Sequence, residues 1–218
     1  MKTYHKIQTV YKRDMEAKGR SKPLIIGKYS RPEFELLENV MWSGTEKIDG
    51  TNIRVMLTQD FNKPHPDELT LEIRGKKDIS EIPKLLMKRL DEIFTLDKMK
   101  QIFKFDVCLY GEGFGGRIQK AGPLYGELDF ILFDVKIGHW WLKRDDVNNI
   151  AKQLGIKSVP VVYKGTLKGA VEYVKKGFKS VISDKEQIAE GLILEPDVQL
   201  FDRKMQRIIT KIKYKDFK

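Results

Sequence analysis

The stretch Glu46-Lys47-Ile48-Asp49-Gly50-Thr51-Asn52 joins two segments of strand character, one ending near Ser43 and one covering 53–57. A lysine just before a turn-forming Asp-Gly pair has an ammonium that is free to reach a phosphate, and a lysine so placed can become a nucleophile. Most short Lys-x-Asp-Gly patterns are solvated hairpin turns, however, because Asp-Gly is a common turn dipeptide. Whether this motif is a plain turn or contains a catalytic Lys47 therefore depends on motifs elsewhere in the chain.

The composition is that of a globular protein with an excess of positive charge. The chain has 218 residues, of which 41% are hydrophobic and 33% charged, enough for a domain with a proper core. Lys and Arg number 41 against 31 Asp and Glu, which gives a net charge of +10. A cationic surface gains affinity for a polyanion by releasing condensed counterions, so the charge favours a nucleic-acid partner without proving one.

Several classes of protein are disfavoured by what the sequence lacks. Its apolar runs, such as Phe130-Ile131-Leu132-Phe133, are too short to span a bilayer, and no apolar region of a signal peptide follows the basic N-terminus. The single cysteine, Cys108, cannot form an internal disulfide, and with three histidines it excludes a zinc site of the usual spacing. We expect a cytoplasmic protein that does not enter a membrane.

Periodicity predicts strands that outnumber helices. Strands are expected at 23–26, on both sides of the opening motif within 40–57, and at 68–73, 105–110, 130–137, 158–163, 191–195 and 207–214. Helices are expected at 83–103, with Leu85, Leu86, Leu90, Ile93 and Phe94 on one face, and at 143–154, 169–176 and 184–189. Because the order shows no regular βαβ alternation, we expect one α+β domain over 1–218, built of antiparallel sheets flanked by helices.

The glycine cluster Gly111-Glu112-Gly113-Phe114-Gly115-Gly116 fits the pattern G-x-G-x-x-G of dinucleotide-binding proteins. Such a site needs a helix that begins on the glycines and directs its first amides at a pyrophosphate. Here Gly122-Pro123 would break a helix within two turns, so a dinucleotide site is not expected.

Four further elements follow the opening motif, and each is weak when taken alone. They are Arg74 in Ile73-Arg74-Gly75, Glu112 in Tyr110-Gly111-Glu112-Gly113, Phe133 in Phe133-Asp134, and the pair formed by Glu190-Gly191 with Lys211-Ile212-Lys213. Arg74 could simply cap an exposed hairpin. Lys211 and Lys213 stand at i and i+2 of a predicted strand, so both ammoniums face one side, where they can neutralise charge that develops at phosphorus.

Together, and in this order, these elements resemble the covalent nucleotidyltransferases, which comprise polynucleotide ligases and mRNA capping enzymes. The resemblance runs from Glu46 to Lys213 and is strongest to RNA ligases of the nick-sealing phage type and to trypanosomal editing ligases. It implies an ATP-grasp-like nucleotidyltransferase domain. DNA ligases continue into an OB-fold and phage RNA ligases into a helical domain, but only five residues follow Lys213 here, so neither C-terminal domain is expected.

The resemblance also implies one nucleotide site, with Lys47 as the residue that becomes adenylated and Lys211 and Lys213 as catalytic contacts to the α-phosphate. Its nucleotide-binding members would be Glu46, Lys47, Asn52, Arg74, Glu112, Phe133, Glu190, Lys211 and Lys213. Phe133 would stack on adenine, and Glu112 and Glu190 would hold the metal. Asn52 is typical of RNA ligases, whereas Asp49 is more typical of DNA ligases.

The function implied is that of an ATP-dependent RNA ligase that uses Mg²⁺ or Mn²⁺ and joins 5′-phosphate to 3′-hydroxyl ends through lysyl-AMP. Its partner would be RNA, including nicked duplexes, and a protein partner could replace the missing C-terminal domain. The alternatives are a DNA ligase, a guanylyltransferase of capping type, and a non-catalytic protein that binds nucleic acid.

Overall fold

The computed structural model describes residues 3–19, 22–59 and 69–218, and these form two compact units. The six-strand unit contains the described residues within 1–5, 49–159 and 183–185. The five-strand unit contains those within 6–48, 160–182 and 186–218. The chain passes from one unit to the other after Ile48, directly beyond Lys47. The expectation of a single domain over 1–218 stays a prediction.

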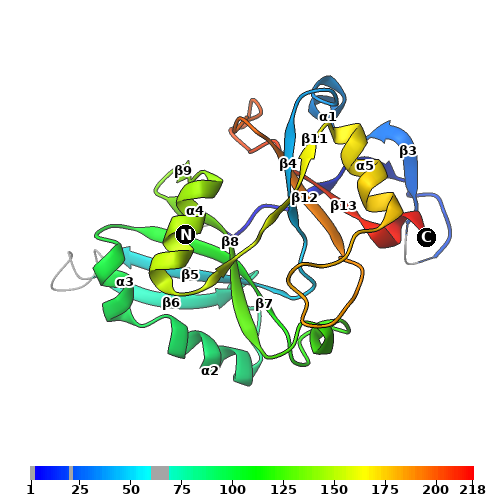
Figure 1. Ribbon diagram of the computed structural model, residues 1–218. Coiled ribbons are helices and arrows are strands. Elements are labelled where there is room, and N and C mark those ends of the chain that lie inside the picture. Colours follow the sequence, from blue (N-terminus) through cyan, green and yellow to red (C-terminus); the bar gives the residue numbers. More distant parts are fainter. Residues whose placement is uncertain (1–2, 20–21, 60–68) are drawn as a thin grey trace. The chain divides into compact units, whose positions relative to one another are not determined.

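The six-strand unit is built on a largely antiparallel sheet with the order β10-β8-β7-β5-β6, and β9 pairs with the last two residues of β8, Lys136 and Ile137 (Figure 1). Its strands are β5 (Thr51–Gln59), β6 (Leu69–Gly75), β7 (Val107–Phe114), β8 (Asp129–Ile137), β9 (Trp140–Trp141) and β10 (Lys157–Ser158). Only β10 runs parallel to its neighbour. The predicted strand at 68–73 corresponds to β6, and its first residue, Glu68, lies outside the described residues.

Three helices form one hydrophobic core with this sheet: α2 (Lys84–Ile93), α3 (Leu96–Ile102) and α4 (Arg144–Leu154). Side chains alternate along a strand, so β5 turns Ile53, Val55 and Leu57 toward the helices. The polar positions Asn52 and Arg54 therefore face the other side.

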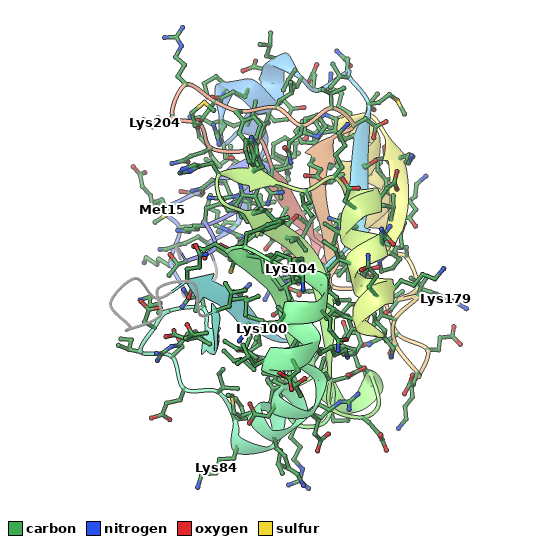
Figure 2. The ribbon with its side chains drawn as sticks, turned by 90° about the vertical axis from the view of Figure 1, so that its left-hand side faces the viewer. Met15, Lys84, Lys100, Lys104, Lys179 and Lys204 are labelled. Carbon is green, nitrogen blue, oxygen red and sulfur yellow. The ribbon has the colours of Figure 1, made fainter. Side chains whose placement is uncertain are left out.

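The segment predicted as one helix over 83–103 forms two. The Thr95 hydroxyl accepts a hydrogen bond from the Lys98 amide at 3.3 Å and starts α3, while α2 ends at Ile93. The assignment of Leu85 to the buried face was wrong, because Leu86, Leu90 and Ile93 form the stripe and Leu85 lies about 100° away from it, 76% exposed. At the first residue of α2, Lys84 projects away from the helix (Figure 2).

The five-strand unit holds a second sheet with the order β1-β13-β12-β4-β11. Its strands are β1 (Gln8–Thr9), β4 (Trp42–Glu46), β11 (Val161–Gly165), β12 (Gly191–Pro196) and β13 (Thr210–Lys213), and a separate pair is formed by β2 (Tyr11–Arg13) and β3 (Leu24–Tyr29). The helix α5 (Leu167–Lys176) packs on this sheet through Leu167, Ala170, Val171 and Val174. The short helix α1 (Pro32–Leu36) contributes Phe34 to the same core.

Two local predictions were wrong for tertiary reasons. The segment 184–189 is not helical: Ile188 forms a bridge with Lys179, and the Ala189 amide donates to the carbonyl of Phe178. The strand predicted over 158–163 divides around Val159-Pro160 into β10 and β11, which belong to different sheets. By contrast, α4 ends on Gly155 as predicted, and this glycine has a φ of 65°.

The glycine cluster lies mainly inside β7, which continues through Phe114, so its glycines do not start a helix. A Cβ at Gly111 would lie 2.0 Å from Cζ of Phe130, and one at Gly113 would lie 2.4 Å from a Leu86 methyl. These glycines let core side chains lie against the backbone, which explains their presence without a dinucleotide.

The expected α+β class is confirmed: the described residues form antiparallel sheets with five α-helices. Within the described part of the chain, no helix is long and apolar enough to cross a membrane.

The α2 stripe gives a stability prediction with a matched control. Leu86→Ala should lower the free energy of unfolding by about 2–5 kcal/mol, because it leaves a cavity against Gly113. The neighbouring substitution Leu85→Ala removes the same atoms from an exposed site and should change it by less than about 0.5 kcal/mol. Urea denaturation measures both, and equal losses would contradict the assigned face.

Candidate active site

Lys47 lies immediately after β4, at the point where the chain leaves the five-strand sheet. Its amide donates to the carbonyl of Gly191 at 2.9 Å, which fixes the backbone of the lysine beside the start of β12. Its side chain is 20% exposed, and Nζ lies 2.6 Å from Oε2 of Glu190. The opening motif is thus not a hairpin turn, because β4 and β5 belong to different sheets.

The Glu190 carboxylate bridges two lysines. Its Oε1 lies 2.7 Å from Nζ of Lys213, while Oε2 binds Lys47. The three residues come from adjacent strands: Lys47 follows β4, Glu190 precedes β12, and Lys213 ends β13, where it pairs with Gly191. Sequence positions 143 residues apart are thereby held in one ion-pair network.

This arrangement determines the charge of Glu190. Burial by itself raises the pKa of the Glu190 carboxyl, but the Coulombic attraction of Lys47 and the hydrogen bond from Lys213 outweigh it, so that the pKa is lowered. A carboxylate is therefore present at neutral pH between the two ammoniums.

Lys211 lies on the same face of β13 as Lys213, as the i, i+2 spacing predicted. The buried residues Thr210 and Ile212 alternate with the half-buried lysines, and Lys211 is opposite Ile193 of β12. Lys211 and Lys213 thus share one face of β13, and Glu190 binds Lys213.

Glu46, the last residue of β4, is almost fully buried at 1% exposed. Its carboxylate accepts hydrogen bonds from the Ser180 hydroxyl and, at 2.9 Å, from the Val181 amide. Burial raises the pKa of Glu46, and these hydrogen bonds only partly offset the effect. In this structure Glu46 holds the segment 180–182 by hydrogen bonds, and its predicted binding of the nucleotide stays a prediction.

The six-strand unit contains the other four predicted residues. Asn52 of β5 is directly opposite Glu112 of β7, and directly opposed residues in an antiparallel pair point to the same side. Arg74 of β6 is opposite Arg54, two residues from Asn52, so it shares that side as well. Asn52, Arg74 and Glu112 therefore lie on the sheet face that the helices leave uncovered.

Asn52 carries an unsatisfied acceptor on this face. Its Oδ1 atom is buried and has no hydrogen-bond partner among the described residues. A buried carbonyl oxygen without a donor destabilises the fold by roughly 1–3 kcal/mol, so a ligand N–H or O–H at this position would relieve a real deficit. The observation supports Asn52 as a binding residue.

Phe133 reaches the same face through a β-bulge. The register of β7 and β8 shifts so that Tyr110 is opposite Asp134 and Gly111 opposite Leu132, which leaves Phe133 as the extra residue. Its ring lies edge-on to Tyr4, with centroids 5.1 Å apart, and the Tyr4 hydroxyl donates to Asp134 at 2.5 Å. Phe130, by contrast, is fully buried in the core.

Three residues that support the site were missed by the sequence analysis: Tyr4, Arg54 and Gln119. The Gln119 amide donates to the carbonyl of Gly50 at 3.3 Å, and a Cβ at Gly50 would lie 2.3 Å from the carbonyl of Gly113. An arginine within an otherwise apolar strand segment was a signal for Arg54. No local pattern marks Tyr4, whose partners lie far along the chain.

Glu112 and Glu190, the metal ligands predicted from the sequence, are each of the chemical kind that Mg²⁺ prefers. Among the described residues no cluster of three or more metal-ligating side chains occurs. Glu112 and Glu190 lie in different units, and each offers a carboxylate. Mg²⁺ typically takes one or two carboxylates and completes its octahedron with water and substrate phosphates. The binding of a metal by Glu112 and Glu190 stays a prediction.

The Glu190 network gives a pH prediction. Because the pKa of Glu190 is lower in the folded protein than the ordinary value of 4.5, its ionisation stabilises the fold above that pH, and this contribution is lost as the pH falls through the folded value. Glu190→Gln should lower the free energy of unfolding by about 1–3 kcal/mol at pH 7, and the difference from wild type should shrink below pH 4.5.

Urea denaturation at a series of pH values measures this difference. The control is Glu186→Gln, whose side chain is 74% exposed in an ion pair with Lys179 and should have almost no effect. A difference between wild type and Glu190→Gln that stays constant down to pH 3 would contradict the assigned network.

Comparison with solved structures identifies the fold. A Naegleria gruberi RNA ligase mutant with ATP and Mn matches with a TM-score of 0.63 and 16% identity, over 96% of this chain and 59% of that one. A second mutant of this ligase with ATP and Mn matches with a TM-score of 0.62 and 18% identity, over 84% of this chain and 52% of that one. The same ligase with PPi matches with a TM-score of 0.61 and 18% identity, over 85% of this chain and 53% of that one. This chain thus spans a little more than half the length of these ligases, and it has their fold.

Comparison with curated protein sequences found no match. The model of the family described as RNA ligase, however, matches residues 41–214. The match begins just before β4 and ends just after Lys213, so it includes all nine predicted site residues. The chain belongs to the RNA ligase family.

Proposed function

We propose that this protein transfers AMP from ATP to Lys47 and then to a 5′-phosphate end of RNA, and that it seals this end to a 3′-hydroxyl. The observation that carries the proposal is the position of Lys47: it directly follows β4 and is held at 2.6 Å by a glutamate that also binds Lys213. Because the chain spans only part of the ligases it resembles, each step is a proposal for this chain.

In the first step the Lys47 nitrogen forms a bond to the α-phosphorus of ATP, and the bond from that phosphorus to the bridging oxygen of the β-phosphate breaks. Pyrophosphate leaves, and Lys47 carries AMP through a phosphoramidate bond. An amine attacks with its lone pair, so the ammonium of Lys47 first gives up a proton. Oε2 of Glu190 is an acceptor within reach at 2.6 Å.

The lysines of β13 would stabilise the charge of this step. Lys211 and Lys213 share one face of the strand, and ammoniums directed at a phosphate act on charge that increases in the transition state. Once Lys47 leaves the ion pair to attack, Glu190 still holds Lys213 by its other oxygen. The proposed function of Glu190 is therefore to hold Lys47 and Lys213 together before the attack and to retain Lys213 during it.

ATP with Mg²⁺ or Mn²⁺ is the proposed co-substrate pair. The similar Naegleria gruberi ligases were solved with ATP and Mn or with PPi, which are a substrate and a product of such a step. Glu112 and Glu190 would hold the metal, which supplies positive charge to the phosphates. Asn52, Arg74 and Phe133 would bind the rest of the nucleotide.

RNA is the proposed nucleic acid, since the chain belongs to the RNA ligase family and Asn52 is typical of these enzymes. The net charge of +10 suits any nucleic acid. The preference for nicked over single-stranded ends, activity on DNA, a protein partner and a cytoplasmic location remain proposals.

The test is covalent labelling by ATP labelled at the α-phosphate in the presence of Mn²⁺. Wild type should take up label, and Lys47→Ala should take up none, because no other nucleophile replaces the lysine nitrogen. Lys179→Ala removes an exposed lysine of the same unit (Figure 2) and should label as wild type does.

The other hypotheses predict different results of the same assay. Labelling by GTP rather than ATP would indicate a capping-type enzyme, and sealing of DNA nicks but not RNA nicks would indicate a DNA ligase. A wild type that binds nicked RNA but never takes up label would refute the ligase and leave a binding protein.

A further inference from the structure

Arg54 is a buried arginine that none of the proposed steps uses. It lies in β5 between the core residues Ile53 and Val55, and it is 1% exposed. Its side chain points to the opposite face, which also carries Asn52 and Glu112. A buried guanidinium usually adds little net stability, because removing it from water offsets the attraction of its partners. Its presence in an apolar strand therefore calls for another reason.

The contacts of Arg54 go to the two sides of one turn. Its Nε donates to the carbonyl of Gly75 at 2.9 Å, and its Nη2 lies 2.6 Å from Oδ1 of Asp78. The planar guanidinium has donors in a rigid fork, so two such bonds fix both the distance and the orientation of the turn. Arg54 thus acts as a brace beneath residues 75–78.

The turn also has hydrogen bonds of its own. The Lys77 amide donates to the Ser80 hydroxyl at 3.0 Å, and the Ser80 amide donates to the Lys77 carbonyl at 3.0 Å. A Cβ at Gly75 would lie 2.8 Å from Cβ of Ser80, so only glycine permits this close return of the chain. The turn is compact, and Arg54 attaches it to β5.

The turn carries a concentration of positive charge. Arg74, Lys76 and Lys77 are all exposed; Arg74 forms an exposed ion pair with Glu72 at 3.4 Å, and the charge of Asp78 is engaged by Arg54. Neighbouring cations repel one another, and an anion placed among them relieves that repulsion. A terminal phosphate has up to two negative charges and several acceptor oxygens, which matches this set.

We propose that Arg54 is a positioning residue: it braces the turn 75–78 so that Lys76 and Lys77 bind the 5′-phosphate end of the RNA strand, next to Arg74, which the family resemblance already assigns to the nucleotide site. The proposal rests on the function proposed above. Arg54 itself touches neither the phosphate nor the reacting atoms. A lysine at this position would keep the charge but could not reach Gly75 and Asp78 in the same fork geometry.

The test isolates the second step of the reaction. Enzyme is loaded with labelled AMP, free ATP is removed, and the transfer of label to a 5′-phosphorylated RNA nick is measured against RNA concentration. Rates are expressed per molecule of labelled enzyme, so a change in the adenylation of Lys47 does not affect the measured rate of transfer.

Arg54→Met should raise the apparent KM for the phosphorylated strand about tenfold, the scale of one lost charge-assisted hydrogen bond, and leave the maximal rate within about twofold. The apparent KM of Arg54→Lys should lie between the values of Arg54→Met and wild type. The control is Arg89→Met, which removes a half-exposed arginine of α2 from its ion pair with Asp129 and should change neither value.

A second variant covers the case in which Arg54→Met does not fold. Asp78 is 76% exposed, so Asp78→Ala should fold normally. Because this substitution removes one of the two partners of Arg54 in the turn, it should raise the KM by a smaller factor than Arg54→Met does. An unchanged KM in folded Arg54→Met, or in both Arg54→Lys and Asp78→Ala, would overturn the proposal.

Binding separates this proposal from the proposed function. By fluorescence anisotropy, wild type should bind a 5′-phosphorylated nick more tightly than a 5′-hydroxyl nick, and Arg54→Met should lose this preference. A wild type that takes up no AMP refutes the ligase, yet a phosphate preference that depends on Arg54 would still support the brace. A preference retained by the folded Arg54→Met variant would refute it.

Discussion

The bridge formed by Glu190 between Lys47 and Lys213 is the interaction on which the proposed chemistry depends. A single half-buried carboxylate holds two ammoniums, one at each oxygen, at 2.6 and 2.7 Å. Without it, the like charges of Lys47 and Lys213, which lie at the ends of strands on either side of β12, would repel each other. With it, the proposed nucleophile Lys47 and the proposed phosphate-binding Lys213 are held by one carboxylate. The half-buried carboxylate of Glu190 therefore keeps two positive charges together at the proposed nucleotide site.

The strand order and register of the two sheets determine where these side chains lie. In the five-strand unit, the order β13-β12-β4 puts the ends of three strands next to each other, and hydrogen bonds from the Lys47 and Tyr214 amides fix the chain on both sides of Glu190. In the six-strand unit, the pairing of β5 with β6 and β7 aligns Asn52, Arg74 and Glu112 on one face. The bulge in β8 adds Phe133 to it. Register, more than helix packing, therefore determines which side chains meet.

Much of this could be predicted because the signals are local. The alternation of Thr210-Lys211-Ile212-Lys213 gave the face of β13, and Gly155 gave the end of α4. The nine predicted site residues came from a resemblance carried by short motifs and their order, and the family match covers them all. The predicted helix at 184–189 failed because its residues form contacts with distant segments, such as the bridge from Ile188 to Lys179, that outweigh weak helix propensity.

The sequence by itself therefore determined the class of fold and the family, and it pointed to Lys47 as the proposed nucleophile, since alternation, caps and motif spacing depend on neighbours along the chain. Only the tertiary structure showed that Glu190 joins Lys47 to Lys213, that Glu46 fastens the 180–182 segment, and that Arg54 braces a basic turn. The physical reason is that each of these is a contact between charged or polar groups far apart in sequence. Such contacts exist only once strand register and burial have brought the groups together, and no local pattern encodes them.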